Sequence, residues 1–338
     1  MATPDQHTVS SEIRKAPAPV LAMAGLLAVA VVASVCVGAS GLSFSRALQG
    51  LLVWDGSADH ALVLDVRLPR AVLAVLVGAN LAVAGLLAQT LTRNPLASPQ
   101  TFGINAGASV AIVLTVAILP GLGTGGTVLP AFAGAAAVGA IMWFLSLSGA
   151  VTTVGLALAG ITLQLVLTAL VQALLIMSAS TQDLVFWLAG SVTGADWSKV
   201  SVILPFTIAG CAAALLFGRH LGVLELDVTT GQSLGQNTRH VAALASLLVV
   251  LLAGSAVAVS GPIGFVGLIV PHIVRRLPGG GDLRRLAGLC LVGGPLLLVC
   301  ADLLGRVVAF PAELPVGIVT ALIGTPTFLL LAARQRHR

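Results

Sequence analysis

Long apolar stretches separated by short polar segments fill most of this 338-residue chain. A helix needs roughly 20 consecutive apolar residues to cross a bilayer core about 30 Å thick. By this measure the pattern predicts an all-α integral membrane protein with about ten transmembrane helices. They cover residues 20–40, 71–92, 101–119, 128–147, 154–177, 200–218, 241–260, 262–277, 286–304 and 314–332. A polar N-terminal tail (1–19) and a basic C-terminal tail (333–338) flank this membrane domain (20–332).

The composition fits a chain that is surrounded largely by lipid. Hydrophobic residues make up 57% of it and charged residues only 9%, against roughly 25% charged residues in an average soluble domain. This excludes a disordered chain, a nucleic-acid-binding domain and an ordinary soluble enzyme. The cysteines lie in apolar runs without metal-ligand spacing, so we expect small buried side chains rather than a metal site. They are Cys36, Cys211, Cys290 and Cys300.

The distribution of basic residues predicts the orientation of the chain. An even number of spans places both termini on the same side of the membrane. If that side is the cytoplasm, 12 of the 17 Lys and Arg residues face inward and 5 face outward, as the positive-inside rule favours. The outward group is Arg46, Arg67, Arg70, Lys199 and Arg306. We therefore expect a multi-pass protein of the inner (cytoplasmic) membrane with both termini in the cytoplasm.

The eighth predicted span, 262–277, is short and contains Pro271 and His272. Interrupted segments of this kind lie inside transporters, where other helices shield irregular backbone from lipid. The sequence therefore predicts a broken helix at 262–277. Separately, Pro95 and Pro99 predict a turn between the second and third spans. The residues of these two structural or pathway motifs are Asn94, Pro95, Gly261, Gly264, Gly267, Pro271 and His272.

Several kinds of chemistry have no matching motif in the sequence. There is no Gly-x-x-x-x-Gly-Lys-Ser/Thr sequence, and neither lysine follows a glycine, so the chain cannot bind ATP through a P-loop of its own. No metalloprotease, serine-hydrolase or Cys-x-x-Cys motif occurs either. We therefore predict no catalytic residue, no metal site and no cofactor on this chain, and a transport rather than an enzymatic role.

Ionisable residues at membrane depth would indicate coupling to an ion gradient. The candidates are Asp302, Arg306, Glu313 and His272, and none is an acid near the middle of a span. This argues against a proton- or sodium-driven carrier. Asp302 and Arg306 are four residues apart, so on a helix they share a face and can pair.

Five short strings carry a family resemblance. They are Arg67-Leu-Pro-Arg70, Asn94-Pro-Leu-Ala-Ser-Pro99, the run Gly261–His272, Glu313-Leu-Pro-Val-Gly317 and Gly324-Thr-Pro-Thr-Phe328. In this order, over about residues 20–332, they resemble the permease family of ABC importers that take up iron–siderophores, haem and vitamin B12. The resemblance implies the type II importer permease fold and a second permease subunit, identical or homologous. It also implies two cytoplasmic ATPase subunits, which would bind ATP and Mg, and an external substrate-binding protein.

The resemblance further implies roles for two groups of residues. Arginines on the outer face oppose the inward excess of basic residues. The resemblance implies that such arginines receive carboxylates of the binding protein. The candidates here are Arg67, Arg70 and Arg306. The alternatives are contact with headgroup phosphates or pairing with Asp65 and Asp302. The inner loop of about 219–240 corresponds to the segment that seats in the ATPase. Its candidate contacts are Leu224, Leu226, Asp227, Gly231, Leu234 and Gly235, with Asp227 and Gly231 standing where the family has glycine and alanine.

Four functions follow as hypotheses. The first is an ATP-driven importer permease for an iron–siderophore complex, and the second is the same machinery carrying haem or cobalamin. Composition cannot separate these two, because a pathway for either would be lined by small apolar residues. An ion-coupled secondary carrier and a non-transporting membrane scaffold are the remaining alternatives. The expected partners are the transporter subunits and the lipid bilayer, with no nucleic acid.

Overall fold

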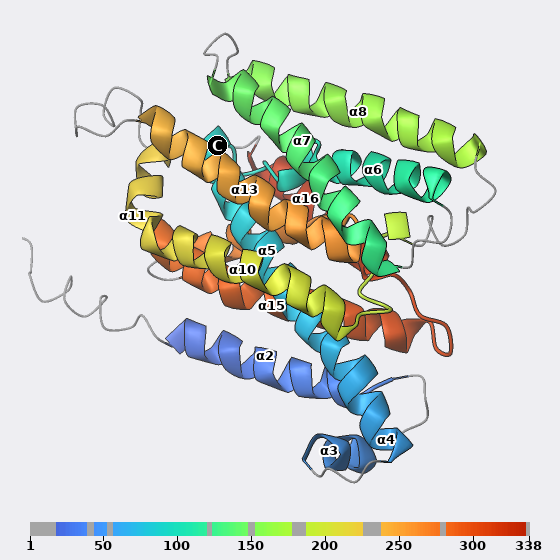
Figure 1. Cartoon of the computed structure of the whole chain (residues 1–338). Coiled ribbons are helices and arrows are strands. Elements are labelled where there is room, and N and C mark those ends of the chain that lie inside the picture. Colours follow the sequence, from blue (N-terminus) through green and yellow to red (C-terminus); the bar gives the residue numbers. More distant parts are fainter. Residues whose placement is uncertain are drawn as a thin grey trace, which may run out of the picture.

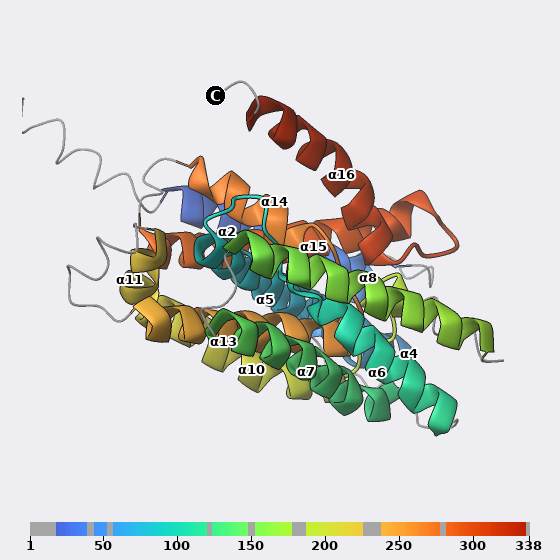
Figure 2. The ribbon, with the colours of Figure 1, turned by 90° about the horizontal axis from the view of Figure 1, so that it is seen from above.

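The computed structural model describes residues 18–38, 44–52, 57–119, 124–147, 153–177, 187–225, 238–277 and 282–335. Within these ranges every regular element is a helix or helical turn, which confirms the predicted all-α fold class. The arrangement is a bundle of long helices (Figures 1 and 2). The tails outside Ala18–Gln335, and residues 226–237 of the predicted inner loop, lie outside the described residues.

Each predicted span has a helical counterpart among the described residues. Seven helical stretches are long and apolar enough to cross a membrane. They contain α2 (Ala18–Cys36), α5 (Leu68–Thr92), α7 (Val128–Leu147), α8 (Thr153–Met177), α10 (Trp197–Leu216), α13 (Thr238–Ser260) and α15 (Leu283–Val308). The three remaining predicted spans correspond to shorter apolar stretches: α6 (Ile104–Ile118), α14 (Val266–Arg275) and residues Val316–Leu330 of α16 (Val316–Gln335).

Short elements join these helices. Two of them, α4 (Ala58–Ala61) and the π-helix η1 (Leu62–Arg67), lead without a break into α5. The others are α3 (Phe44–Leu52), η2 (Pro99–Phe102), η3 (Thr124–Thr127), α11 (Gly218–Leu221) and η4 (Gly222–Glu225). The connection between the first two predicted spans, residues 41–70, is therefore partly helical.

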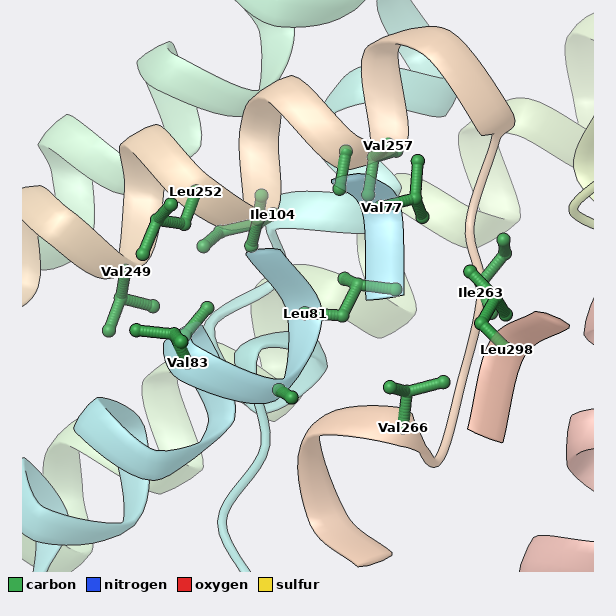
Figure 3. Close-up of a cluster of buried hydrophobic side chains, with 14 of the residues drawn as sticks. Val77, Leu81, Val83, Ile104, Val249, Leu252, Val257, Ile263, Val266 and Leu298 are labelled. Carbon is green, nitrogen blue, oxygen red and sulfur yellow. The ribbon is translucent and has the colours of Figure 1, made fainter. Parts of the chain in front are cut away.

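Helix α5 lies at the centre of the bundle, in contact with α10, α13, α14 and α15 (Figure 1). Its side chains Leu73, Leu86 and Leu87 are fully buried. Figure 3 shows Val77 of α5 beside Val257 of α13 within this core. By contrast, α8 lies at the edge of the bundle, where most of its apolar surface is exposed. An apolar exterior of this kind is expected where lipid replaces water.

Glycines bring α5 close to two of its neighbours. A Cβ on Gly78 would lie 2.6 Å from the Gly294 carbonyl oxygen of α15, and a Cβ on Gly85 would overlap the Gly267 backbone of α14. At both points the helices meet backbone to backbone, as small residues allow in membrane helix packing.

The predicted broken helix is confirmed at α14, which spans only ten residues. Helix α13 ends at Ser260, and residues 261–264 are not helical, so the prediction was wrong in extending the eighth span back to residue 262. The reason is local: Gly261 has φ of +69°, Pro262 follows it, and Phe265 caps α14 with φ of +67°. Figure 3 shows Ile263 on this extended segment, which leads to Val266 at the start of α14.

Candidate functional sites at the two ends of α5

Two clusters of polar side chains lie at opposite ends of α5. We call them the Arg70 end, where α5 begins, and the Arg93 end, where it stops. Ionisable groups buried in a membrane bundle need partners, because each unpaired one costs several kcal/mol or more. The hydrogen bonds of each cluster therefore show which helices it joins.

At the Arg70 end, one guanidinium binds two carboxylates from distant parts of the chain. Arg70 Nη2 and Nε donate to Asp302 Oδ1 at 2.8 and 3.2 Å, and Nε also reaches Oδ2 at 3.2 Å. Arg70 Nη1 donates to Glu313 Oε2 at 2.6 Å. Asp302 is only 2% exposed, whereas the Glu313 side chain is 24% exposed. The contact with Glu313 is therefore the more accessible side of this cluster.

The other two arginines of this cluster bind the end of α2. Arg306 pairs with Asp302 one turn earlier on α15, and it donates to the Ser34 and Val37 carbonyl oxygens at 2.8 and 3.0 Å. It also donates to Ser34 Oγ at 2.7 Å. Arg67 Nη1 donates to the Val35 and Cys36 carbonyl oxygens, both at 2.9 Å. Carbonyls in the last turn of a helix have no intrahelical donor, so both guanidinium groups cap α2.

The structure thus brings together the three arginines that the sequence singled out as candidates for docking. Arg67, Arg70 and Arg306 are 5–8% exposed and hydrogen-bonded within the chain. Of the predicted alternatives, pairing with Asp302 is confirmed for Arg70 and Arg306. Docking of a binding protein stays a prediction. Sequence reasoning missed Ser34, although a serine near the end of an apolar run is a signal for a buried polar contact.

At the Arg93 end, three side chains form a closed ring of hydrogen bonds. Glu225 Oε1 accepts from Thr90 Oγ1 at 3.2 Å and from Arg275 Nη1 at 2.9 Å. Arg275 Nη2 donates in turn to Thr90 Oγ1 at 3.3 Å. The ring joins α5, η4 and α14. Sequence reasoning missed Thr90 and Glu225 and assigned Arg275 no partner.

Arg93 adds a contact to the backbone of η4. It ends α5 in the left-handed conformation, with φ of 50°, and its Nε donates to the Leu224 carbonyl oxygen at 2.9 Å. A turn follows at Pro95 and Leu96, with Asn94 Oδ1 accepting from the Leu96 amide at 2.9 Å. A cleft of about 250 Å³ opens here, lined by Gln89, Thr90, Arg93, Pro95, Glu225 and Arg275.

The predicted coupling residues are only partly described. Leu224 is 7% exposed and belongs to the main hydrophobic core, which is an internal position. The other predicted contacts, Leu226, Asp227, Gly231, Leu234 and Gly235, lie outside the described residues.

The Gly261–His272 motif lies inside the bundle, between α5 and α16. Gly264 approaches the Gln100 side-chain amide, and Gly267 meets the backbone of α5. Gln89 Nε2 of α5 donates to the Gly267 and Leu268 carbonyl oxygens at 3.3 and 3.4 Å. Pro271 is buried and His272 half-buried. In the described residues no three His, Cys, Asp or Glu side chains gather where they could hold a metal ion.

Known proteins resemble this chain over almost its full length. The sequence profile of the FecCD transport family matches residues 26–334. The Fe(3+)-citrate import system permease protein YfmD of Bacillus subtilis (strain 168) is 48% identical over 301 residues, covering 89% of this chain and 90% of that protein. The hemin transport system permease protein HmuU of Yersinia pestis is 39% identical over 322 residues, covering 93% and 94%. A solved structure of a metal-chelate type ABC transporter, in an inward-facing conformation, matches with a TM-score of 0.83 at 28% identity, covering 94% of this chain and 99% of that one.

Proposed function

Because this chain belongs to the FecCD transport family, it is a transport permease and not an enzyme, and we propose that it moves an iron(III)–siderophore chelate across the membrane. It is the membrane-spanning subunit of an ABC importer, in which a separate subunit hydrolyses ATP. The observation that carries the proposed cargo is the 48% identity to a permease for Fe(3+)-citrate, which is itself a ferric chelate. Haem is the second candidate, because a hemin permease is 39% identical.

Membership of the family also implies partner subunits. A second permease and an ATPase are the partners of such a chain. We infer that the second permease lies along α16. An open apolar groove of about 590 Å³ supports this position; its lining residues are Ala189, Gly317, Ile318, Ala321, Leu322, Thr325 and Pro326. Helix α16 also projects from the rest of the bundle, so a partner has room to pack on it (Figure 2).

We propose that the Arg70 end faces the outside and the Arg93 end faces the cytoplasm, with both termini cytoplasmic. The excess of inward basic residues supports this orientation. On this basis residues 226–237 seat in the ATPase. The binding protein docks at the Arg70 end, where its carboxylates approach Arg67, Arg70 and Arg306.

The internal ion pairs define how such docking can occur. Since Asp302 is 2% exposed and Glu313 is 24% exposed on its side chain, an incoming carboxylate reaches Arg70 by displacing Glu313 rather than Asp302. Arginine suits this exchange, because its planar guanidinium can bind two carboxylates on different edges.

An uptake experiment tests the cargo. A strain that lacks the chromosomal copy of this gene is supplied with the chain and incubated with labelled ferric citrate, ferric siderophores, haem or cobalamin. We expect uptake of a ferric chelate that depends on this chain and on its ATPase. Uptake of haem or cobalamin alone would overturn the cargo and leave the importer function intact, whereas ion-gradient-driven uptake without the ATPase would contradict the importer itself.

A further inference from the structure

The polar contacts at the Arg93 end have no role in the function proposed so far, although they join segments far apart in sequence. We propose that Thr90, Glu225 and Arg275, together with the Arg93 contact to Leu224, act as positioning residues that transmit movement of residues 226–237 to α5 and α14. We call this set the coupling latch. The inference rests on the proposed function, because it takes residues 226–237 as the segment that the ATPase moves.

The ring of hydrogen bonds fixes each of its members by two contacts. The Thr90 hydroxyl donates to Glu225 Oε1 at 3.2 Å and accepts from Arg275 Nη2 at 3.3 Å. Glu225 Oε1 also accepts from Arg275 Nη1 at 2.9 Å. Because one atom of Glu225 receives both donors, a displacement of this side chain acts on α5 and α14 together.

The latch is attached directly to the segment that would move. Glu225 is joined to residue 226 by a single peptide bond. One residue earlier, Leu224 is buried in the core and its carbonyl accepts from Arg93 Nε at 2.9 Å. The backbone of η4 is therefore held by an apolar contact, a hydrogen bond and an ion pair. A displacement at residue 226 would therefore be transmitted to α5 and α14 through these contacts.

From the latch, contacts continue to the interior of the bundle. Gln89, one residue before Thr90, donates to the carbonyls of Gly267 and Leu268 in the first turn of α14. Phe265, which caps that turn, lies against Gly324 of α16, where a Cβ would overlap its ring. Helix α14 is thus held to α5 at both of its ends and touches α16 at its start. Movement of the latch is positioned to shift α14 against α16.

The exposure of the latch separates this role from a structural one. The side chains of Arg275 and Glu225 are 29% and 37% exposed, and ion pairs at such positions add little to fold stability. A stabilising role would therefore predict almost no effect of removing them. A transmitting role predicts a folded, assembled importer in which ATP hydrolysis drives less transport.

The experiment uses the complete importer, with its ATPase and binding protein, in proteoliposomes. Glu225→Gln, Arg275→Gln and the double variant are compared with Arg276→Gln, which removes a charge from the exposed neighbouring residue. Substrate transported per ATP hydrolysed is measured, along with the amount of ATPase that co-purifies. We expect each single variant to lower this ratio about fivefold or more, the double variant to be no worse than either single, and Arg276→Gln to match the parent.

Two outcomes overturn the inference, and a third separates it from the proposed function. The latch is wrong if Glu225→Gln and Arg275→Gln keep the parental ratio, or if their effects add fully in the double variant. Leu234→Asp serves as the test of the loop itself. If Leu234→Asp uncouples transport while the latch variants do not, the latch alone fails. If Leu234→Asp leaves ATPase binding and transport unchanged, the assignment of residues 226–237 to the ATPase fails and the latch fails with it.

Discussion

Replacing Asp302 by Asn would remove a negative charge that Arg70 and Arg306 share. The carboxylate is 2% exposed, and it accepts hydrogen bonds from Nε and Nη2 of both arginines. The amide keeps the shape but offers one acceptor oxygen and no charge. Arg306 is then left facing backbone carbonyls and Ser34 without a counter-ion among these contacts, while Arg70 keeps Glu313.

The expected cost follows from burial. Removing one partner of a buried ion pair destabilises by about 3–5 kcal/mol, because it leaves an uncompensated buried charge. The assay is equilibrium unfolding of the purified permease in mixed detergent, followed by helical circular dichroism. Asp59→Asn provides a matched control on the same chain, since its pair with Arg46 has a distance of 3.9 Å and side chains 41% and 71% exposed. The control should change the free energy of unfolding by no more than about 0.5 kcal/mol. Equal effects of the two substitutions would refute the argument that burial sets the cost.

Three further predictions concern packing, energy and docking. Gly85→Ala should destabilise the protein by about 1–3 kcal/mol, because its Cβ would overlap the Gly267 backbone. Gly288→Ala is the control and should be neutral or stabilising, since nothing lies within 4 Å of its Cβ. The same unfolding assay compares the two variants. The purified chain alone should hydrolyse no ATP, since it lacks a P-loop, and clean permease with measurable phosphate release would contradict this. Glu313→Gln should raise the affinity of the binding protein in a surface-binding titration, because the competing carboxylate is gone. Arg70→Glu should lower that affinity, most strongly at low salt. Unchanged affinity in both variants would exclude docking at Arg70.

Most of the spans and their order were predictable from the sequence, because a helix that crosses the bilayer needs about 20 apolar residues. The break before α14 was also predictable in kind, since Gly261 and Pro262 cannot continue α13 as a regular helix. The exact start of α14 was not predictable. It depends on Phe265 adopting the left-handed conformation, which a non-glycine residue rarely does without tertiary contacts.

The partners of the charged residues were less predictable. The Asp302–Arg306 pair follows from helical spacing, but Arg70 lies 232 residues from Asp302 and 243 from Glu313. Nothing local to these positions specifies such pairings, which depend on α5 packing against α15. The partners of Glu225 are likewise not specified by nearby residues. Glu225 contacts Thr90 and Arg275 only when η4 packs against α5 and α14. Sequence reasoning therefore located the arginines and offered Asp302 as their partner, but it missed Glu313 as a partner of Arg70 and Ser34 as a partner of Arg306.

One helix connects both ends of the molecule. Helix α5 has 25 residues and thus rises about 38 Å at 1.5 Å per residue, beginning next to Arg67 and ending at Thr92, beside the contacts of Thr90 and Arg93. If the partners at the two ends each favour one position of this helix, thermodynamic reciprocity applies to them. The factor by which a docked binding protein changes the affinity for the ATPase must equal the factor by which the ATPase changes the affinity for the binding protein. Docking of the binding protein on one face of the membrane could therefore be measured as a change in the affinity for the ATPase on the other face.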